Sequence, residues 1–381
     1  IFFRPTCFFL RTIMSTKPTS VEGLTCFVTG GSGFVGQRLC EMLLDQGAKK
    51  VISFDISGEP QFARHDPRLD YVQGDLVDYE QVAKAMGPGV DCVWHIAALV
   101  GPFHPKERYM AVNYRGTLNI IKACKALGCK RIVMSSSPST RMDGGHIEGL
   151  REDQMKIPKK FLQDYAESKA AGEVALREAC NEEEDFLTVA VAPHQVYGPR
   201  DALFLPNLLS ASYNGKLRIF GDGENEISVC HVDNYCHGLI LGYLALYKGS
   251  PALGKFYIVT DGGKKKFWHI LDDAMVQLGC TSLFTKTKLP IWLMMTVAYI
   301  CNVLGFILRR KFKLTPFTVK MLYIHRWFDI SNAERDLGYK PLIKFEDGWQ
   351  DMIAWFKDHP DFWRSAAAQT AGKTTKAKKK D

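Results

Sequence analysis

The chain has 381 residues, of which 46% are hydrophobic and 24% are charged. This composition is typical of a globular protein and excludes an intrinsically disordered chain. The formal net charge is +8, but residues 371–381 hold five lysines and one aspartate, so the rest of the chain is closer to neutral. The sequence shows no basic stripe with interleaved aromatic residues, and we therefore expect no nucleic-acid partner.

Eleven cysteines are scattered through apolar runs, and none belongs to a Cys-x-x-Cys pair. An odd number without the spacing of a disulfide framework predicts reduced thiols that pack as small hydrophobic side chains. The same pattern gives no support for a metal site, and we expect none.

The first residues precede the predicted fold. Residues 1–13 are apolar with two arginines and no acidic residue, which fits either a cropped targeting segment or sequence upstream of a start at Met14. We favour a start at Met14, and we expect residues 1–20 to be a leader or disordered segment.

From residue 24 onwards, short apolar runs alternate with helical periods. We expect buried strands at 24–30, 50–57, 69–76, 91–99, 130–137 and 187–193, and helices at 36–47, 78–86, 113–129 and 164–180. Such alternation predicts an α/β fold, a doubly wound parallel sheet with helices on both faces. We assign residues 21–200 to this doubly wound, Rossmann-type domain.

After residue 200 the alternation becomes irregular, which predicts a smaller, second region over residues 201–364 that completes a substrate cleft. Residues 365–381 are rich in alanine, threonine and lysine and are expected to be a disordered basic tail. Within the second region, residues 289–308 carry no charge, and basic residues flank them on both sides.

The motif TGGSGFVG follows the first predicted strand and opens the first predicted helix. Gly30 permits a tight turn, Gly33 lets a pyrophosphate approach the backbone, and Gly36 allows close packing of helix against strand. Asp55 ends the second strand about twenty residues later, where a carboxylate suits a ribose 2′-hydroxyl and repels a 2′-phosphate. The pattern predicts dinucleotide binding, with NAD favoured over NADP.

The segment YAESK places Tyr165 and Lys169 four residues apart on one face of a helix. A lysine ammonium and a positive nicotinamide would lower the pKa of the phenol, which allows a tyrosine to act as acid and base near neutral pH. Ser137 ends a predicted strand, and strand carboxyl ends face the ligand crevice of a doubly wound sheet. Its hydroxyl could bind the substrate oxygen that the tyrosine deprotonates.

Taken together, the motifs resemble those of the extended short-chain dehydrogenase/reductase family. TGGSGFVG, GDL, HIAA, NYRGT, SSS, YAESK and APHQVYGPRD occur in the family's order and cover roughly residues 24–260. The resemblance implies that Ser137, Tyr165 and Lys169 are the catalytic residues, with the third serine of SSS fitting the pattern best. It also implies that Asn113 supports the lysine through a water molecule.

The resemblance further implies where a cofactor would bind. Asp75 and Leu76 are assigned to the adenine side, Ala97 to the ribose, and the segment from Pro193 to Val196 to the nicotinamide amide. The complete set of implied cofactor contacts is Gly30, Gly33, Phe34, Val35, Gly36, Asp55, Asp75, Leu76, Ala97, Asn113, Tyr165, Lys169, Pro193 and Val196.

Two segments depart from the family pattern. Ala192 stands where the family often has arginine before the proline, and PSTRMDG follows the serines instead of a segment containing VYG. Both changes affect the wall of the cleft more than the predicted catalytic residues. His194 and His231 also fall near the cleft, and we interpret them as hydrogen-bonded structural histidines rather than general bases.

Within the family, the hydroxysteroid branch fits best, on VISFDIS, APHQVYGPRDALFLPNLLSASYNGKLRIFGDGEN, TPFTV and DISNAERDLGYKPLIKFEDG. The resemblance implies a sterol or steroid substrate, and most specifically an NAD-dependent, decarboxylating oxidation of a sterol 4α-carboxylate in sterol biosynthesis. Such a reaction would favour an arginine facing the carboxylate, and the sequence leaves open whether this is Arg141, Arg200 or another residue.

Three alternatives stay open. A 3β-hydroxysteroid dehydrogenase/isomerase needs a second acid–base step on the ring double bond, a reductase of flavonoid-like ketones would prefer NADPH, and a non-catalytic NAD-binding scaffold would typically lack the tyrosine or the lysine. A homodimer is a further open point.

The run from Leu289 to Leu308 is long enough to cross a hydrocarbon core of about 30 Å. However, Pro290, Asn302 and Gly305 weaken it as an uninterrupted helix, and the segment beyond it resembles part of the same substrate domain. A buried core helix is one alternative. We favour a monotopic or re-entrant anchor at a membrane surface.

The last residues place Lys378 and Lys379 at the positions of a dilysine retrieval signal. Their alternative role is that of a solubilising tail. Together with the apolar run, they lead us to expect the cytosolic face of the endoplasmic reticulum membrane, with lipid droplets as an alternative location.

Overall fold

The structure is a computed structural model that describes residues 17–101, 104–308, 312 and 314–364. The predicted leader, the basic tail and the dilysine positions therefore lie mostly or wholly outside the described residues.

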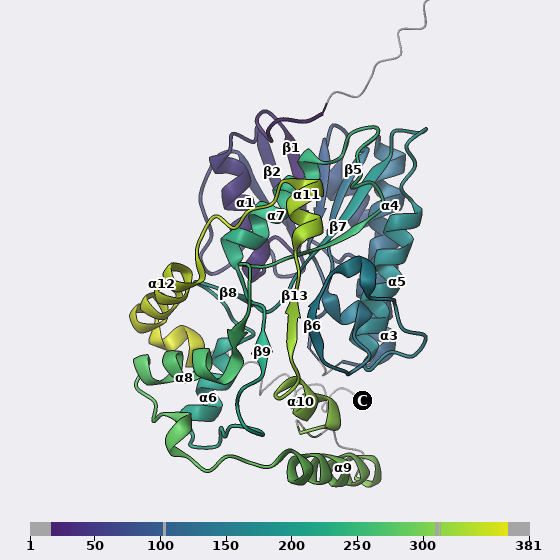
Figure 1. Cartoon of the computed structure of the whole chain (residues 1–381). Coiled ribbons are helices and arrows are strands. Elements are labelled where there is room, and N and C mark those ends of the chain that lie inside the picture. Colours follow the sequence, from purple (N-terminus) through teal and green to yellow (C-terminus); the bar gives the residue numbers. More distant parts are fainter. Residues whose placement is uncertain (1–16, 102–103, 309–311, 313, 365–381) are drawn as a thin grey trace, which may run out of the picture.

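A seven-stranded sheet forms the larger layer of the molecule, in the upper part of Figure 1. Its order is β11-β7-β5-β4-β1-β2-β3, and every neighbouring pair is parallel. The strands are β1 (Thr25–Thr29), β2 (Lys50–Asp55), β3 (Leu69–Gln73), β4 (Cys92–His95), β5 (Arg131–Ser135), β7 (Leu187–Pro193) and β11 (Phe256–Val259). The predicted doubly wound α/β fold is confirmed.

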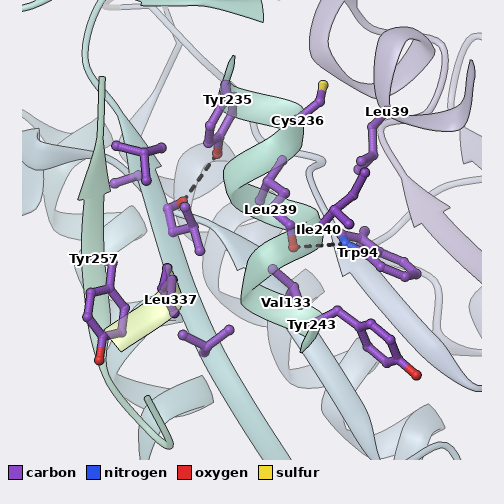
Figure 2. Close-up of a cluster of buried hydrophobic side chains, with 14 of the residues drawn as sticks. Leu39, Trp94, Val133, Tyr235, Cys236, Leu239, Ile240, Tyr243, Tyr257 and Leu337 are labelled. Atoms are coloured by element: carbon purple, nitrogen blue, oxygen red, sulfur yellow. Dashed lines mark hydrogen bonds between the residues drawn. The ribbon is translucent and has the colours of Figure 1, made fainter. Parts of the chain in front are cut away.

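Helices cover both faces of this sheet, as parallel strands require. They are α1 (Phe34–Asp45), α2 (Tyr79–Met86), α4 (Gly116–Leu127), α5 (Asp164–Glu178) and α7 (Val232–Leu244). Residues of α1 and α7 share one buried core with the strands, while residues of α2, α4 and α5 share another. On the first face, the indole of Trp94 donates a hydrogen bond of 3.2 Å to the backbone oxygen of Leu239, which fixes α7 on the sheet (Figure 2).

A second region is built around a four-stranded sheet of order β12-β9-β13-β6. Its strands are β6 (Ile147–Leu150), β9 (Glu226–Ile227), β12 (Lys265–Lys266) and β13 (Arg326–Phe328). The helices α6 (Leu205–Tyr213), α8 (Phe267–Gln277) and α12 (Phe345–Asp358) contribute to a separate core that includes the buried side chains of Trp268 and Phe356. The short pair β8 (Val196–Tyr197) and β10 (Cys230–His231) connects the two regions.

The sheet topology corrects the domain boundary expected at residue 200. β11 and α7 follow that residue but belong to the seven-stranded layer, whereas β6 precedes it and pairs with β13 in the smaller sheet. The chain thus crosses between the regions several times. The irregular pattern after residue 200 hid this, because one strand of four residues carries too little periodicity to be assigned to a sheet.

The remaining elements are short connections. They are α3 (Lys106–Tyr109), a π-helix (Met110–Arg115), 3₁₀ helices at Pro138–Arg141, Glu152–Gln154 and Leu283–Thr285, α10 (Pro316–Met321) and α11 (Ser331–Leu337).

The apolar run forms α9 (Ile291–Ile307), which contacts α10 and lies at the end of the molecule away from the large sheet (Figure 1). Only Ala298 of this helix is buried, whereas Trp292 is 71% exposed and Phe306 is 88% exposed. The alternative of a buried core helix is therefore wrong. Within the described residues, no helix combines the length and hydropathy needed to cross a membrane.

One buried carboxyl group stands out in the 3₁₀ helix Glu152–Gln154, which contacts the edge strand β11. Glu152 is 7% exposed, and neither of its side-chain oxygens has a hydrogen-bond partner among the described residues. Burial raises the pKa of its carboxyl group to about 7. At pH values between the ordinary pKa of 4.5 and this raised pKa, the Glu152 carboxyl group is ionised in the unfolded chain but keeps its proton in the folded chain. The free energy of unfolding therefore falls as the pH rises through this range.

We therefore expect Glu152→Gln to stabilise the protein above pH 7, by about 3 kcal/mol from the size of the shift, and to have little effect near pH 4.5. Urea unfolding at pH 4.5 and pH 8 measures this difference. Glu148→Gln, at an exposed position on β6, is the matched control and should change stability by less than about 0.5 kcal/mol at both pH values. An equal effect of Glu152→Gln at both pH values would contradict the assignment.

Candidate active site

The turn between β1 and α1 has the geometry of a phosphate-binding loop. Gly30 has φ +71°, and a Cβ there would lie 2.7 Å from the backbone nitrogen of Ala97, so only glycine fits. Helix α1 begins at Phe34 with Gly33 as its N-cap, and no side chain caps it. Its first backbone N–H groups are thus available to an anion.

Gly33 and Gly36, the other two glycines to which a role was assigned, differ in what requires them. A Cβ on Gly36 would lie 2.0 Å from the backbone oxygen of Gly30, so the packing of the loop itself demands glycine. A Cβ on Gly33 would meet only that same oxygen, at 3.2 Å, and Gly33 lines the large cavity described below. The space beside Gly33 therefore fits the close approach of a ligand.

Asp55 lies at the carboxyl end of β2, as predicted. Its carboxylate accepts hydrogen bonds from the backbone N–H groups of Ser57, at 2.9 Å, and Ser32, at 3.3 Å. Backbone donors hold the carboxylate in place and leave further lone pairs for ligand hydroxyls. This arrangement suits a ribose, and the negative charge disfavours a 2′-phosphate.

A cavity of about 850 Å³ extends from this loop toward the second region. Its wall includes most of the predicted cofactor contacts, namely Gly30, Gly33, Phe34, Val35, Gly36, Asp55, Asp75, Leu76, Ala97 and Val196. Asn113, Tyr165, Lys169 and Pro193 are not part of this wall. On the side of the second region, the cavity is lined by apolar residues such as Leu203, Phe204, Leu208, Phe267 and Leu322.

Asn113 lies in the π-helix and is buried. Its side-chain oxygen accepts from the backbone N–H of Leu99 at 2.7 Å, and its amide donates to the backbone oxygen of Leu99 at 3.1 Å and to Ser168 at 3.0 Å. These bonds tie the cavity-lining Leu99 to α5. The predicted role of Asn113, water-mediated support of the lysine, stays a prediction.

Helix α5 carries the predicted tyrosine and lysine. Lys169 is 2% exposed, and its Nζ donates a hydrogen bond of 2.6 Å to the backbone oxygen of Ser135. Burial lowers the pKa of Lys169 to about 8, whereas the negative charge of Glu173, one turn further along α5, opposes this shift. Lys169 therefore still carries its proton at neutral pH.

Tyr165 is partly exposed, and burial raises the pKa of its phenol to about 12, while a hydrogen bond with Ser137 acts in the opposite direction. The net direction is opposite to the lowering expected from the sequence. The expected lowering of the phenol pKa required two cations, the ammonium group of Lys169 and the nicotinamide. In the structure, the ammonium group donates its hydrogen bond to the backbone oxygen of Ser135. The catalytic roles of these residues stay predictions.

The structure distinguishes the three serines at the end of β5. Ser135 Oγ accepts a hydrogen bond of 2.7 Å from Tyr235, and Ser136 Oγ donates one of 2.6 Å to Glu173. Ser137 Oγ lies 2.9 Å from Ser139 Oγ, and the hydroxyl group of Ser137 acts to lower the pKa of the Tyr165 phenol. The choice of Ser137 as the catalytic serine stays a prediction.

The two arginines that the sequence left open are both bound to carboxylates. Arg141 forms a buried ion pair of 2.6 Å with Glu173, and Arg200 bonds to both carboxylate oxygens of Glu41, at 2.7 and 2.8 Å. Sequence analysis missed Arg326, which lines the cavity from β13. The signal for it was weak: one arginine in a short strand of the second region, outside any of the recognised motifs.

The two histidines near the cleft are structural in this fold, as interpreted. His194 Nδ1 donates a hydrogen bond of 2.6 Å to the backbone oxygen of Ser228, and burial lowers the pKa of His194 to about 3. His231 Nδ1 accepts from the backbone N–H of Asp233 and caps α7, and burial lowers its pKa as well. Each is a neutral hydrogen-bonding group at physiological pH.

The sequence of the chain matches the model of one known protein family over most of its length. Residues 27–291 match the model of the 3-beta hydroxysteroid dehydrogenase/isomerase family. The chain belongs to this family. Membership confirms the predicted hydroxysteroid branch and the prediction of an oxidoreductase that acts on a hydroxyl group.

Several curated members of the family are similar over most of their length. The human sterol-4-alpha-carboxylate 3-dehydrogenase, decarboxylating, is 31% identical over 90% of this chain and 90% of its own. The 3beta-hydroxysteroid-dehydrogenase/decarboxylase isoform 1 of Arabidopsis thaliana is 32% identical over 86% of this chain and 78% of its own. A 2-alkyl-3-oxoalkanoate reductase of Stenotrophomonas maltophilia is 31% identical over 86% of this chain and 98% of its own.

Solved structures share the fold. An epimerase from Methanothermobacter thermautotrophicus superimposes with a TM-score of 0.71 at 21% identity, over 91% of this chain and 95% of its own. The UDP-glucuronic acid 4-epimerase from Bacillus cereus, in complex with NAD, gives 0.65 at 20% identity, over 88% of this chain and 99% of its own. At these identities the likeness concerns the extended Rossmann fold.

The glycine contrast gives a test of the loop. We expect Gly33→Ala to leave the fold intact and to weaken dinucleotide binding at least about tenfold, because its Cβ would occupy the space beside the helix N-terminus. Gly36→Ala, the matched variant three residues away, should lower the melting temperature, because its Cβ collides with backbone. Isothermal titration with NAD and thermal melting measure the two effects. Unchanged NAD affinity in Gly33→Ala would contradict the assignment.

Proposed function

We propose that this oxidoreductase uses NAD to oxidise the 3β-hydroxyl group of a sterol 4α-carboxylate, and that the resulting ketone loses carbon dioxide. The observation that carries the proposal is its similarity, across 90% of both chains, to an enzyme named for this reaction. The carboxylate of Asp55 at the cavity supports NAD over NADP. Bound NAD would accept the hydride that leaves carbon 3.

The residues at the end of β5 and on α5 would carry the proton chemistry. Tyr165 would take the proton of the 3-hydroxyl group, and Ser137, whose hydroxyl acts to lower the pKa of the phenol, would hold the substrate oxygen. Before that step the phenol must itself lose its proton to solvent, and the ammonium group of Lys169, fixed to the backbone of β5, would stabilise the phenolate that then accepts the substrate proton. Because the phenol pKa stands near 12 without ligands, the proton would leave only when substrate and cofactor are both bound.

Loss of carbon dioxide would follow from the position of the new ketone. The carboxylate on carbon 4 is β to the carbonyl at carbon 3. When the bond between carbon 4 and the carboxyl carbon breaks, its electron pair moves into the carbonyl group and gives an enolate, and carbon dioxide leaves. Protonation at carbon 4 then completes the ketone. Oxidation is thus the step that makes the carboxylate labile.

A second candidate function is favoured by the similarity to 2-alkyl-3-oxoalkanoate reductase. That name describes a carboxylic acid with an oxygen function on the β carbon, which is also the relation between carbon 3 and the carboxylate of the sterol acid. The two candidates share the reacting unit and differ in the apolar body attached to it. The substrate of a steroid dehydrogenase/isomerase would carry no such carboxylate.

We further propose that α9 holds the protein at a membrane surface, on the cytosolic face of the endoplasmic reticulum. The support is physical: Ile300, Val303 and Phe306 are 52%, 60% and 88% exposed, and water disfavours such a surface. Trp292 and Tyr299, also exposed, are residues suited to the interface between headgroups and hydrocarbon. A sterol dissolves in this layer, so the anchor would bring the cavity to its substrate.

The first test supplies purified protein with a 4α-carboxysterol and NAD, and measures reduced cofactor and the decarboxylated ketone. Tyr165→Phe should lower this turnover by roughly 100- to 10,000-fold while NAD affinity is retained, because the proton acceptor is lost and the loop is intact. Tyr213→Phe, at an exposed position on α6, is the control and should be fully active. Turnover of an unsubstituted 3β-hydroxysteroid with double-bond migration, in place of the acid, would sink the proposal, and a 2-alkyl-3-oxo acid as the better substrate would favour the second candidate.

The second test measures cosedimentation with phosphatidylcholine vesicles. The triple variant Ile300→Gln, Val303→Gln, Phe306→Gln should lower the vesicle-bound fraction at least about tenfold, because it removes most of the exposed apolar surface of α9. Val276→Gln with Leu342→Gln removes exposed apolar side chains elsewhere and should bind like the unaltered protein. Equal loss in both variants would argue against a specific role of α9.

A further inference from the structure

Arg326 is a buried cation on the wall of the cavity. It begins β13, is 7% exposed, and lines the same cavity as the glycine loop. Within the described part of the chain it forms no ion pair, which distinguishes it from Arg141 and Arg200.

The guanidinium group of Arg326 is only partly satisfied by protein atoms. Nη1 lies 3.4 Å from Nε2 of His194, and Nη2 donates a hydrogen bond of 2.8 Å to the backbone oxygen of Met321. Nε is buried without a partner among the described residues. Burial lowers the pKa of Arg326 to about 10, so the group is still charged at neutral pH.

Such an arrangement is costly for a protein. A buried charge without a counter-ion loses its hydration, and an unpaired N–H group adds to that loss. A guanidinium group with free N–H donors on a cavity wall is therefore built to receive an anion from outside the chain. Its planar fork matches the two oxygens of a carboxylate.

The position of Arg326 is near the predicted reacting end of the cavity. His194, which it contacts, lies within the segment from Pro193 to Val196, the segment expected to hold the nicotinamide amide. Gln195 and Val196 of this segment line the cavity together with Arg326. An anion bound there would lie close to the carbon that gives up its hydride.

The other charged residues of the cavity are less suited. Asp201 is buried, but it is an anion, and its oxygens accept three backbone N–H groups of residues 203–205 at 2.8, 3.0 and 2.9 Å. Asp55 and Asp75 belong to the predicted adenosine side. Arg108 also lines the cavity, but it is exposed to solvent, where a carboxylate would gain less from it.

We propose that Arg326 binds the carboxylate of the substrate and thereby selects β-hydroxy acids over neutral 3β-hydroxysteroids. This inference rests on the proposed function and adds the residue that determines specificity. Because a guanidinium group stabilises the carboxylate and not the departing carbon dioxide, the contact serves binding and orientation during oxidation. It plays no part in the cleavage of the carbon–carbon bond.

The test compares Arg326→Gln, Arg326→Lys and Arg108→Gln with the unaltered enzyme, each saturated with NAD. It measures kcat/KM for a 4α-carboxysterol, and the inhibition constants of a 3-deoxy 4α-carboxysterol and of its methyl ester. In Arg326→Gln, kcat/KM for the acid and the affinity for the 3-deoxy acid should fall at least about tenfold, with unchanged affinity for the ester. Arg326→Lys keeps the charge but loses the planar guanidinium group, so its kcat/KM and its affinity for the 3-deoxy acid should lie between those of the unaltered enzyme and Arg326→Gln. Arg108→Gln should retain the preference for the acid.

The outcomes separate the two proposals. Suppose that the unaltered enzyme oxidises the acid, but that both Arg326 variants lower the affinity for the 3-deoxy acid and for its ester equally, or leave both affinities unchanged. The inference is then overturned and the proposed function stands. The same holds if Arg108→Gln alone loses the preference. If the unaltered enzyme does not oxidise the acid, the proposed function fails and the inference fails with it. NAD affinity and melting temperature are measured for every variant, and Arg326→Lys serves as the conservative variant. Together they distinguish a loss of carboxylate binding from a folding defect.

Discussion

The buried carboxylate of Glu173 is the constraint on which the geometry of the site depends. It accepts hydrogen bonds from Ser136 at the end of β5 and pairs with Arg141 in the segment that follows. Glu173 lies on α5 one turn after Lys169, so this pairing fixes strand and helix against each other. Removing one partner of such a buried pair typically costs about 3–5 kcal/mol, since the other charge stays buried alone.

The same contact gives a structural role to one of the two departures from the family motif. PSTR replaces the usual residues after the serines, and its arginine, Arg141, stacks on the ring of Phe256 at 3.5 Å while it pairs with Glu173. The segment thus joins β5, α5 and the edge strand β11 in one polar and aromatic cluster. An arginine that the sequence presented as a candidate for substrate binding is used to hold the sheet together. This role could not be read from the sequence, because Glu173 is 32 positions away.

The parts of the site that sequence analysis predicted share a local cause. The glycine loop, Asp55 and the pair on α5 are each determined by a few neighbouring residues, so their spacing carries the information. The parts that it missed depend on contacts between distant segments. Arg326 lines the cavity only because β13 pairs with β6, which lies almost 180 residues earlier in the chain. The domain boundary was misplaced for the same reason, since the pairing of β11 with β7 is not encoded in either segment alone. The pKa of Tyr165 was expected to fall because only the two nearby cations, the lysine ammonium and the nicotinamide, were considered, whereas burial by the whole fold dominates in the structure.

The crossing of the chain between its two regions also has a chemical consequence. The first region supplies the groups suited to the cofactor and the proton, which Rossmann folds of many activities share. The second region supplies the apolar lining, the exposed helix α9 and Arg326, the one buried cation among the described residues of the cavity wall. A sterol acid has the complementary distribution, with a rigid apolar body and its charge next to the reacting carbon. An apolar cavity alone would discriminate weakly between sterols, whereas a partly unsatisfied buried cation penalises every ligand that cannot pair with it. Specificity on this scaffold would therefore reside in the second region, and the chemistry in the first.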